Sequence, residues 1–315
     1  MVPRVSVVIP AYGVAPYIGE TLASVFEQTW QDREVIVVND GSPDSPALEA
    51  ALAPWRERIV YHVQPNGGAS AARNAGIRLA RGEFIGFLDG DDRWDPAAIA
   101  FHVAVLEADP SLGLHFSNGT FFGQSHLAGR EMMDVCRVEG EIALIPLLRG
   151  VCSVFIGGVA RKAALEQAGL FDPAVRTSED FDLWVRLLGQ GWRIGYTRQR
   201  LFWSRIRAGS LSSDRTRMEC SALQVFEKIG TNGQLNPEER AVLKEEIRRH
   251  QAVLALETGK QDLRAARYGD ARRHFTAAYA ELKGRKLGFV IGGLHVCPPL
   301  VRWLMTRRDE QAGAV

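Results

Sequence analysis

Short runs of apolar, mostly β-branched residues alternate with segments of helical periodicity along the N-terminal third of the chain. The runs predict four strands, and helix-like segments separate them. The strand segments are residues 4–12, 34–40, 58–63 and 83–92, and helical segments lie at residues 16–28 and 69–82. Because the runs are apolar throughout, they are typical of strands that helices cover on both faces. The pattern predicts an α/β protein with an open, doubly wound, mostly parallel sheet.

Three of the predicted strands end in polar or aromatic residues. These endings are Pro10-Ala11-Tyr12, Asn39-Asp40-Gly41 and Asp89-Gly90-Asp91. Ligands of open α/β sheets bind outside the carboxyl ends of the strands. We therefore expect the three endings to meet at one edge of the sheet and to form a ligand site there.

The pattern is looser beyond residue 109. It predicts a helix at 97–109, a strand and loop at 112–123, a helix at 140–150, a strand followed by a helix at 154–171, and an amphipathic helix at 178–191. From about residue 214 the chain consists of helix formers with charged faces and shows no convincing strand. This change predicts a domain at residues 1–213 and a helical C-terminal region at residues 214–315.

The C-terminal segment 285–308 is apolar between two basic ends, Arg285-Lys286 and Arg307-Arg308. Pro298-Pro299 and Arg302 interrupt it, so it falls short of the roughly 20 apolar residues that a spanning helix needs. Two interpretations remain open: a buried terminal helix, or an element lying in a membrane surface with its basic flanks against anionic lipid.

Composition is that of an ordinary folded protein, with 46% hydrophobic and 24% charged residues among 315. A net charge of +1 gives no general electrostatic reason to expect nucleic acid as a partner. The four cysteines form no C-x-x-C pair, and the apolar run before Pro10 is too short for a signal-peptide core. We expect a cytoplasmic protein, with peripheral membrane contact if the second interpretation of the C-terminal segment holds.

The segment "FIGFLDGDDRWDP" places three aspartates, Asp89, Asp91 and Asp92, within four positions after a buried strand. Such carboxylates repel one another unless a positive charge lies among them. Oxygen ligands suit Mg²⁺ or Mn²⁺, which one or two carboxylates hold while phosphate oxygens complete the coordination shell. Helix capping is the alternative, and we prefer it for Asp95, because Asp-Pro is a common helix start. Asp89 and Asp91 lie too far before that helix to cap it.

Four ordered blocks then carry a family resemblance. They are "VSVVIPAY", "EVIVVNDGSPD", "NGGASAARNAGIRLARGEFIGFLDGDD" and "SEDFDLWVRLL". In order and spacing they resemble the inverting GT-A glycosyltransferases of family 2, which use a nucleotide-sugar donor and a D-x-D metal motif. The resemblance covers roughly residues 4–213, and it implies a Rossmann-like GT-A fold with Mn²⁺ or Mg²⁺ as cofactor.

The resemblance implies a donor site at the strand ends. Pro10, Ala11 and Tyr12 would contact the nucleobase, with Tyr12 stacking on the ring. Asp40 would bind the base or its ribose, and the alternative is an aspartate that starts the turn in "NDGS". Relatives often have two acids here, and this chain departs from them with Asn39.

Phosphate and metal contacts are implied for the next blocks. Gly67 and Gly68 would supply flexible backbone. Arg73 would pair with the acidic motif or reach the diphosphate, unless it is a surface arginine. In the D-x-D motif, Asp89 would touch the ribose or the metal, Gly90 would allow a close backbone approach, and Asp91 would ligate the metal directly.

Catalysis is implied for the "ED" pair. Asp180 would be the general base that takes the acceptor proton, with Glu179 beside it. The alternative is a capping box from Thr177 to Asp180, and Asp182 is expected to be structural. Where relatives often have a metal-assisting histidine, this chain has Arg207. Arginine cannot ligate a metal, but it can bind a diphosphate bidentately.

These features predict an inverting transferase that moves a sugar from a nucleotide-diphosphate donor to a hydroxyl of a glycan or glycolipid, in cell-surface polysaccharide or glycolipid synthesis. The alternative is a catalytically silent nucleotide-sugar-binding or scaffold module at the membrane surface. A dinucleotide oxidoreductase and a P-loop enzyme are disfavoured, because neither G-x-G-x-x-G nor G-K-[ST] follows a strand. A nucleotidyltransferase is disfavoured because the loop after the first strand lacks basic residues.

Overall fold

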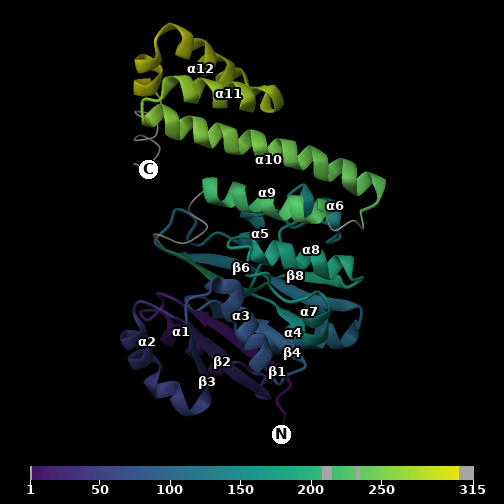
Figure 1. Ribbon diagram of the computed structural model, residues 1–315. Helices are drawn as coiled ribbons and strands as arrows, with labels where there is room; N and C mark the ends of the chain where they lie inside the picture. Colours follow the sequence, from purple (N-terminus) through teal and green to yellow (C-terminus); the bar gives the residue numbers. More distant parts are fainter. Residues whose placement is uncertain (1, 208–214, 232–234, 305–315) are drawn as a thin grey trace. The chain divides into compact units, whose positions relative to one another are not determined.

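In a computed structural model, the chain forms two compact units, residues 1–210 and residues 211–315. The structure describes residues 2–207, 215–231 and 235–304 (Figure 1). Each unit is described by itself below. The first contains all of the strands in the described part of the chain, and the second is helical there.

The first unit is built on one eight-stranded sheet with the order β3-β2-β1-β4-β7-β6-β8-β5. Its strands are β1 (Val5–Ala11), β2 (Arg33–Asp40), β3 (Val60–Gln64), β4 (Phe84–Phe87), β5 (Arg93–Trp94), β6 (Leu112–Gly123), β7 (Val159–Arg161) and β8 (Arg193–Ile206). Strands β1 to β4 are parallel, as their sequence pattern predicts. Strand β7 joins β4 to β6 through two antiparallel pairings. The four N-terminal strands therefore have their carboxyl ends on one edge.

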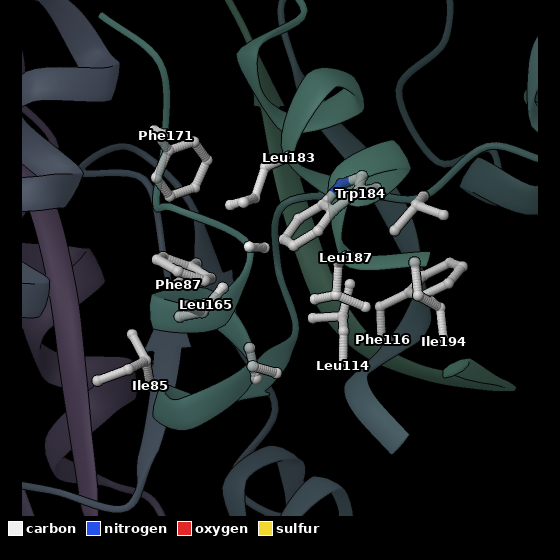
Figure 2. Packing of buried hydrophobic residues seen from close by; sticks show 14 of the residues in the cluster. Ile85, Phe87, Leu114, Phe116, Leu165, Phe171, Leu183, Trp184, Leu187 and Ile194 are labelled. Carbon is white, nitrogen blue, oxygen red and sulfur yellow. The ribbon is translucent and has the colours of Figure 1, made fainter. Parts of the chain in front are cut away.

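Alternate side chains of each central strand enter separate apolar clusters on the two faces of the sheet. In β1, Val7 and Ile9 enter one cluster and Val8 enters the other, and all three are fully buried. Figure 2 shows the second cluster, where Phe87 of β4 lies near Phe171 and the residues of a helix on that face. Burial on both faces explains why these strands have no polar alternation.

Helices flank both faces of this sheet (Figure 1). They are α1 (Ile18–Phe26), α2 (Ser45–Leu52), the 3₁₀ helix η1 (Ala53–Arg58), α3 (Gly68–Leu79), α4 (Ala98–Ala108), α5 (Met132–Val135), α6 (Leu144–Leu148), α7 (Lys162–Gln167) and α8 (Glu179–Gly189). Side chains of α1, α2 and α4 pack in one cluster, and those of α3, α7 and α8 pack in the other. The arrangement is a helix–sheet–helix sandwich.

Strands β6 and β8 differ from the sequence prediction. Residues 112–123 are strand over their whole length rather than strand and loop, and β8 was not predicted at all. The two strands pair in parallel along their length with register shifts near Ser117 and Asn118. Most side chains of β8 are exposed or only partly buried. The strand can therefore contain arginines among its apolar residues, and it lacks the continuous apolar run by which the other strands were predicted.

The second unit contains α9 (Arg215–Thr231), α10 (Pro237–Arg264), α11 (Tyr268–Leu282) and α12 (Arg285–Val296), followed by helical residues 298–304. Helices α10, α11 and α12 share an apolar cluster that centres on Phe275, which is fully buried. Helix α10 begins with a reciprocal capping box between Asn236 and Glu239. None of the helices in the described ranges is long and apolar enough to cross a membrane.

Candidate functional site

The ends of β1 and β4 approach each other closely at the carboxyl edge of the sheet. A Cβ atom on Gly90 would lie 2.9 Å from Val14 Cγ2 and 3.0 Å from the Pro10 carbonyl oxygen. Only glycine fits there without a shift of the backbone. Gly90 thus brings Asp89 and Asp91 beside the segment Pro10-Ala11-Tyr12, of which Ala11 is buried and Tyr12 is half exposed.

The loop after β1 is held by two residues that the sequence analysis did not single out. The Ser42 hydroxyl accepts a hydrogen bond from Gly13 N at 2.7 Å, and Asp44 Oδ2 accepts one from Ala15 N at 3.0 Å. Burial raises the pKa of Asp44, but the hydrogen bonds from Ser42 and from backbone amides outweigh it, so the pKa is lowered. Asp44 therefore stays ionised and fixes the backbone that follows Tyr12. Both residues belong to the block "NDGSPD", which was the available signal.

Asn39 and Asp40 end β2 with different tasks. The Asn39 amide oxygen accepts from Ser42 N at 2.9 Å, so the turn in "NDGS" starts at Asn39 rather than at Asp40. The Asp40 carboxylate instead accepts from the backbone amides of Gly67 and Gly68, at 2.9 and 2.8 Å. These amides open α3, where a carboxylate is favourable. Gly68 has a φ of +84°, which favours glycine at this position.

Arg73 is the buried centre of the site. Its side chain is only 5% exposed, and its guanidinium pairs with Asp89 Oδ1 at 2.8 Å and with Glu179 Oε1 at 2.6 Å. Burial lowers the pKa of Arg73, but the two carboxylates raise it further, so the guanidinium is always charged. The interpretation of Arg73 as a surface arginine is wrong. One side chain of α3 connects the end of β4 to the start of α8.

Asp91 has a second arginine as its partner. Arg207, directly after β8, places Nε 2.7 Å from Asp91 Oδ2 and donates from Nη1 to the Gly13 carbonyl at 2.9 Å. Burial and the nearby Asp89 raise the pKa of Asp91, and Arg207 opposes that rise. Two of the three clustered carboxylates thus have arginines as counter-charges.

Asp92 and Asp95 are structural. Asp92 is buried and accepts from Arg205 N at 2.7 Å, which attaches the end of β4 to β8. Burial, together with Asp89 and Asp91, raises its pKa well above the usual value. Asp95 Oδ1 accepts from Ala97 N at 2.9 Å, but α4 begins at Ala98. The helix predicted at residues 97–109 therefore begins one residue later than expected, and Asp95 stabilises the turn before the helix rather than capping the helix itself.

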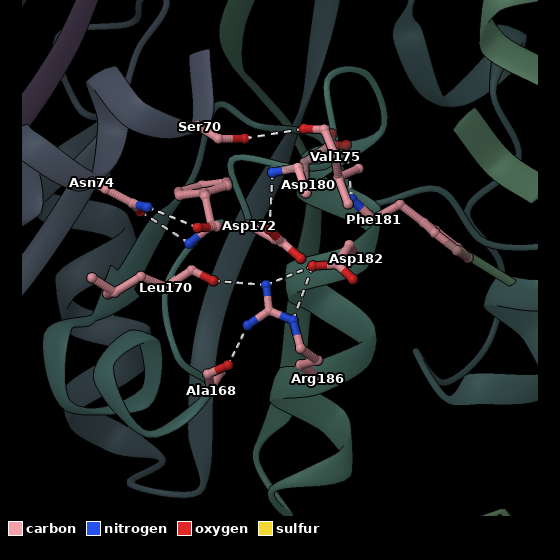
Figure 3. Close-up of polar contacts among 12 residues, drawn as sticks. Ser70, Asn74, Ala168, Leu170, Asp172, Val175, Asp180, Phe181, Asp182 and Arg186 are labelled. Atoms are coloured by element: carbon pink, nitrogen blue, oxygen red, sulfur yellow. Dashed lines mark hydrogen bonds and ion pairs between the residues drawn. The ribbon is translucent and has the colours of Figure 1, made fainter. Parts of the chain in front are cut away.

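Asp180 lies in the first turn of α8 (Figure 3). Burial and the neighbouring Glu179 carboxylate raise its pKa to about 6, although a backbone hydrogen bond from Phe181 and the charge of Arg73 act in the opposite direction. The residue before the helix is Ser178, in the left-handed region at φ 61°, and its side chain makes no capping hydrogen bond. The N-cap position is therefore Ser178, whereas the alternative of a capping box from Thr177 to Asp180 places it at Thr177.

Asp182, expected to be structural, accepts from Arg186 one turn later, at 2.6 Å from Nη2 (Figure 3). Arg186 also donates to the carbonyls of Ala168 and Leu170. This network attaches α8 to the chain after α7. The ion pair with Arg186 occupies Asp182, whereas the raised pKa of Asp180 suits proton transfer.

Asp89 and Asp91 are the carboxylates of this site that could take part in holding a metal ion. Within residues 2–207, 215–231 and 235–304, no three His, Cys, Asp or Glu side chains form a group that could hold a metal ion by themselves. Mg²⁺ commonly takes only one or two carboxylates and completes its shell with water and substrate phosphate. The two carboxylates across Gly90 fit an ion that is shared with a diphosphate.

Residues 6–147 match the model of Glycosyl transferase family 2. These residues are therefore similar to a family 2 glycosyltransferase domain. The chain is 31% identical over 198 residues to an uncharacterised glycosyltransferase of Rickettsia felis, over 59% of this chain and 31% of that protein. It is 26% identical over 230 residues to the putative teichuronic acid biosynthesis glycosyltransferase TuaG of Bacillus subtilis, over 72% of this chain and 88% of TuaG.

Solved structures show that the fold of this chain is GT-A. Staphylococcus aureus TarS 1–349, in complex with UDP-GlcNAc, superposes with a TM-score of 0.65 at 17% identity, over 98% of this chain and 92% of TarS 1–349. The mannosyltransferase PcManGT from Pyrobaculum calidifontis, in complex with GDP-Man and Mn²⁺, gives 0.59 at 21% identity, over 98% and 88%. The chain spans only about a third of the length of three Rickettsia glycosyltransferases to which it is similar.

Proposed function

We propose that this protein transfers a sugar, with inversion, from a nucleotide-diphosphate sugar to an acceptor hydroxyl. The observation that carries the proposal is the buried bridge through Arg73. It joins Asp89 of the D-x-D motif to Glu179, the neighbour of Asp180, by ion pairs of 2.8 and 2.6 Å. Such a bridge holds a donor-binding motif and an acid suited to proton transfer in one rigid arrangement.

The donor would bind along the carboxyl edge of β1, β2 and β4. Tyr12 has an exposed ring that can stack on a nucleobase, and the anchored backbone from Gly13 to Ala15 would keep it in place. Asp40 would contact the base or ribose with an acceptor site that its three hydrogen bonds leave free. UDP-GlcNAc bound to TarS supports a donor of this class.

Mn²⁺ or Mg²⁺ would be held by Asp91, with Asp89 beside it, and would stabilise the charge on the leaving diphosphate. The Mn²⁺ in PcManGT supports a divalent ion. Asp180 would accept the proton of the attacking hydroxyl, because its raised pKa makes it a stronger base than an ordinary aspartate.

The acceptor is proposed to be a glycan or glycolipid of a cell-surface polysaccharide. TuaG, the putative teichuronic acid glycosyltransferase to which the chain is similar, supports this class. The second unit adds a reason to expect contact with anionic lipid. Phe289 and Val296 of α12 are 81% and 85% exposed, and the sequence from residue 283 to 308 contains basic residues but no Asp or Glu.

Thermal-shift measurements with UDP- and GDP-sugars, with and without Mn²⁺, test the donor proposal, because a ligand of the folded state raises its apparent stability. A donor that stabilises the protein should also be hydrolysed or transferred. Stabilisation without turnover, in the presence of candidate acceptors, would favour the alternative of a silent sugar-binding module. If no donor stabilises the protein or turns over, the proposal is wrong.

Flotation with phosphatidylglycerol-containing vesicles tests the membrane contact. Phe289→Glu places a negative charge on the exposed face of α12 and is expected to reduce binding severalfold. Val63→Glu, at an exposed position of β3, is the control and should bind as the unaltered protein does. Equal flotation of all three proteins, or flotation with none, would remove the membrane role.

A further inference from the structure

The two carboxylates of the D-x-D motif are paired with arginines that differ in how firmly they are held. Arg73 is 5% exposed and binds two acids, Asp89 and Glu179. Arg207 is 33% exposed and has one acid, Asp91, whose side chain is 14% exposed. If Arg73 lost its partners, a buried charge would remain without a counter-charge, which is unfavourable in free energy. Arg207 can turn toward another anion at a much smaller cost.

Arg207 also reaches across the site. Its guanidinium contacts Asp91 on one side and the carbonyl of Gly13 on the other. Gly13 directly follows Tyr12, the proposed nucleobase contact, and Asp91 is the proposed metal ligand. A diphosphate joins the nucleoside to the sugar, so it must cross the interval that Arg207 spans. This step rests on the proposed function.

We propose that Arg207 is an exchangeable counter-charge that keeps a metal ion off Asp91 until a nucleoside diphosphate binds. A guanidinium cannot ligate a metal, and it repels the ion while it neutralises the carboxylate. An incoming diphosphate offers Arg207 two negatively charged oxygens that it can bind bidentately. The arginine moves to the phosphates, and Asp91 becomes available to the metal.

The metal ion and the nucleotide must then bind cooperatively. Each must raise the protein's affinity for the other, and by the same factor. A histidine at this position could ligate the metal directly and would give no such exclusion. Arg207 is thus a positioning residue that makes metal binding conditional on the donor.

Mn²⁺ binding by the whole protein, followed by electron paramagnetic resonance without nucleotide, tests the exchange. Arg207→Gln removes the counter-charge and is expected to bind Mn²⁺ about tenfold more tightly than the unaltered protein. Arg207→Lys keeps a cation and should bind weakly, as the unaltered protein does. Arg200→Gln is the charge-matched control, because Arg200 lies on the same strand and pairs with Glu131 at 3.9 Å; it should leave the affinity unchanged. Arg207→Gln combined with Asp91→Asn should lose the gain.

Saturating UDP or GDP provides the second measurement. The nucleotide that stabilises the protein should tighten Mn²⁺ binding to the unaltered protein at least tenfold, and to Arg207→Gln much less. Equal Mn²⁺ affinity of Arg207→Gln and the unaltered protein without nucleotide, including no binding by either, would overturn the exchange. Sugar transfer, assayed separately, distinguishes this failure from that of the proposed function: turnover with no gain in Arg207→Gln rejects the exchange alone.

Discussion

The carboxylate of Asp180 must be ionised if it is to take a proton from an acceptor hydroxyl. Its pKa is raised to about 6, so the group is protonated and inactive as a base below that pH. We expect kcat/KM to fall about tenfold for each pH unit below 6. Asp180→Asn should lower kcat by about two to four orders of magnitude. If the residual activity of this variant still falls below about pH 6, the fall in kcat/KM is due to the ionisation of another group.

Glu179 offers a sharper test of the same residue, because its charge contributes to the raised pKa of Asp180. Glu179→Gln retains an oxygen that can accept from Arg73 but removes the charge. The acidic limb of the pH profile should therefore move to lower pH. A limb that stays in place would show that Glu179 does not act on the catalytic base.

A buried histidine pair gives a prediction of stability. His102 Nδ1 and His115 Nδ1 lie 2.8 Å apart, and burial lowers their pKa values to about 3 and about 4. The unfolded chain takes up protons below about pH 6.5, whereas the folded chain does not. The pair therefore does not reduce the free energy of unfolding above pH 6.5. As the pH falls from 6.5 toward 4, protonation of the unfolded chain should lower that free energy.

Urea unfolding at pH 7 and pH 5 measures this loss. Replacing both histidines by leucine removes both partners of the contact between the two rings together, so neither ring is left without the other. Between pH 7 and pH 5, the double variant should lose less stability than the unaltered protein does. The difference should be up to about 2 kcal/mol per histidine, because pH 5 lies one and a half pH units below 6.5. An identical loss in both proteins would assign the acid sensitivity elsewhere.

Among the elements, helix α10 has a start that its sequence specifies completely. Asn236 accepts from Glu239 N at 2.9 Å, and the Glu239 side chain accepts from Asn236 N at 2.9 Å. Asn236→Ala should therefore destabilise the second unit by about 1 kcal/mol, measured as a lower urea midpoint. Glu245→Gln, at an exposed position inside the helix, is the control and should change little.

The strands that could be predicted from sequence are those with apolar side chains on both faces. In Val7–Ile9 of β1 and Val35–Val38 of β2, successive side chains enter the two clusters in alternation, so these stretches are apolar throughout. Strand β8 could not be recognised in this way, because three consecutive exposed residues, Arg198 to Arg200, interrupt it and most of its other side chains are only partly buried. The helix start at Ala98 was misplaced because the side chain of Asp95 caps a turn rather than the helix itself.

The candidate site was predictable in its residue types and in one of its ion pairs. Clustering of Asp89, Asp91 and Asp92 implied a nearby cation, and the family resemblance implied that Arg73 could pair with the acidic motif, as it does with Asp89. The sequence could not reveal that Arg207, 134 positions after Arg73 in the chain, pairs with Asp91. Contacts between distant segments depend on strand order, and the position of β8 was unknown. The roles of Asp40, Asp91 and Asp180 in binding and catalysis stay predictions for experiment.

For the whole molecule, the two compact units imply that donor binding needs only the first. Every residue of the proposed donor site, from Pro10 to Arg207, lies within residues 1–210. A chain of residues 1–213 is therefore expected to fold and to bind the nucleotide with an affinity within about threefold of the full chain, measured by calorimetry. A folded short chain, judged by circular dichroism, that does not bind would give the second unit a part in the site.

The bridge through Arg73 has a consequence for how such enzymes diversify. A guanidinium is planar, and its nitrogens are a fixed distance apart. The ion pairs with Arg73 therefore fix the distance between the carboxylates of Asp89 and Glu179. The spacing between the sugar-nucleotide end and the proton-accepting end of the site is then nearly invariant. A change of acceptor must therefore be accommodated by residues other than this bridge. Arg73→Lys would keep the charge, but a single ammonium group would not fix the distance between the two carboxylates.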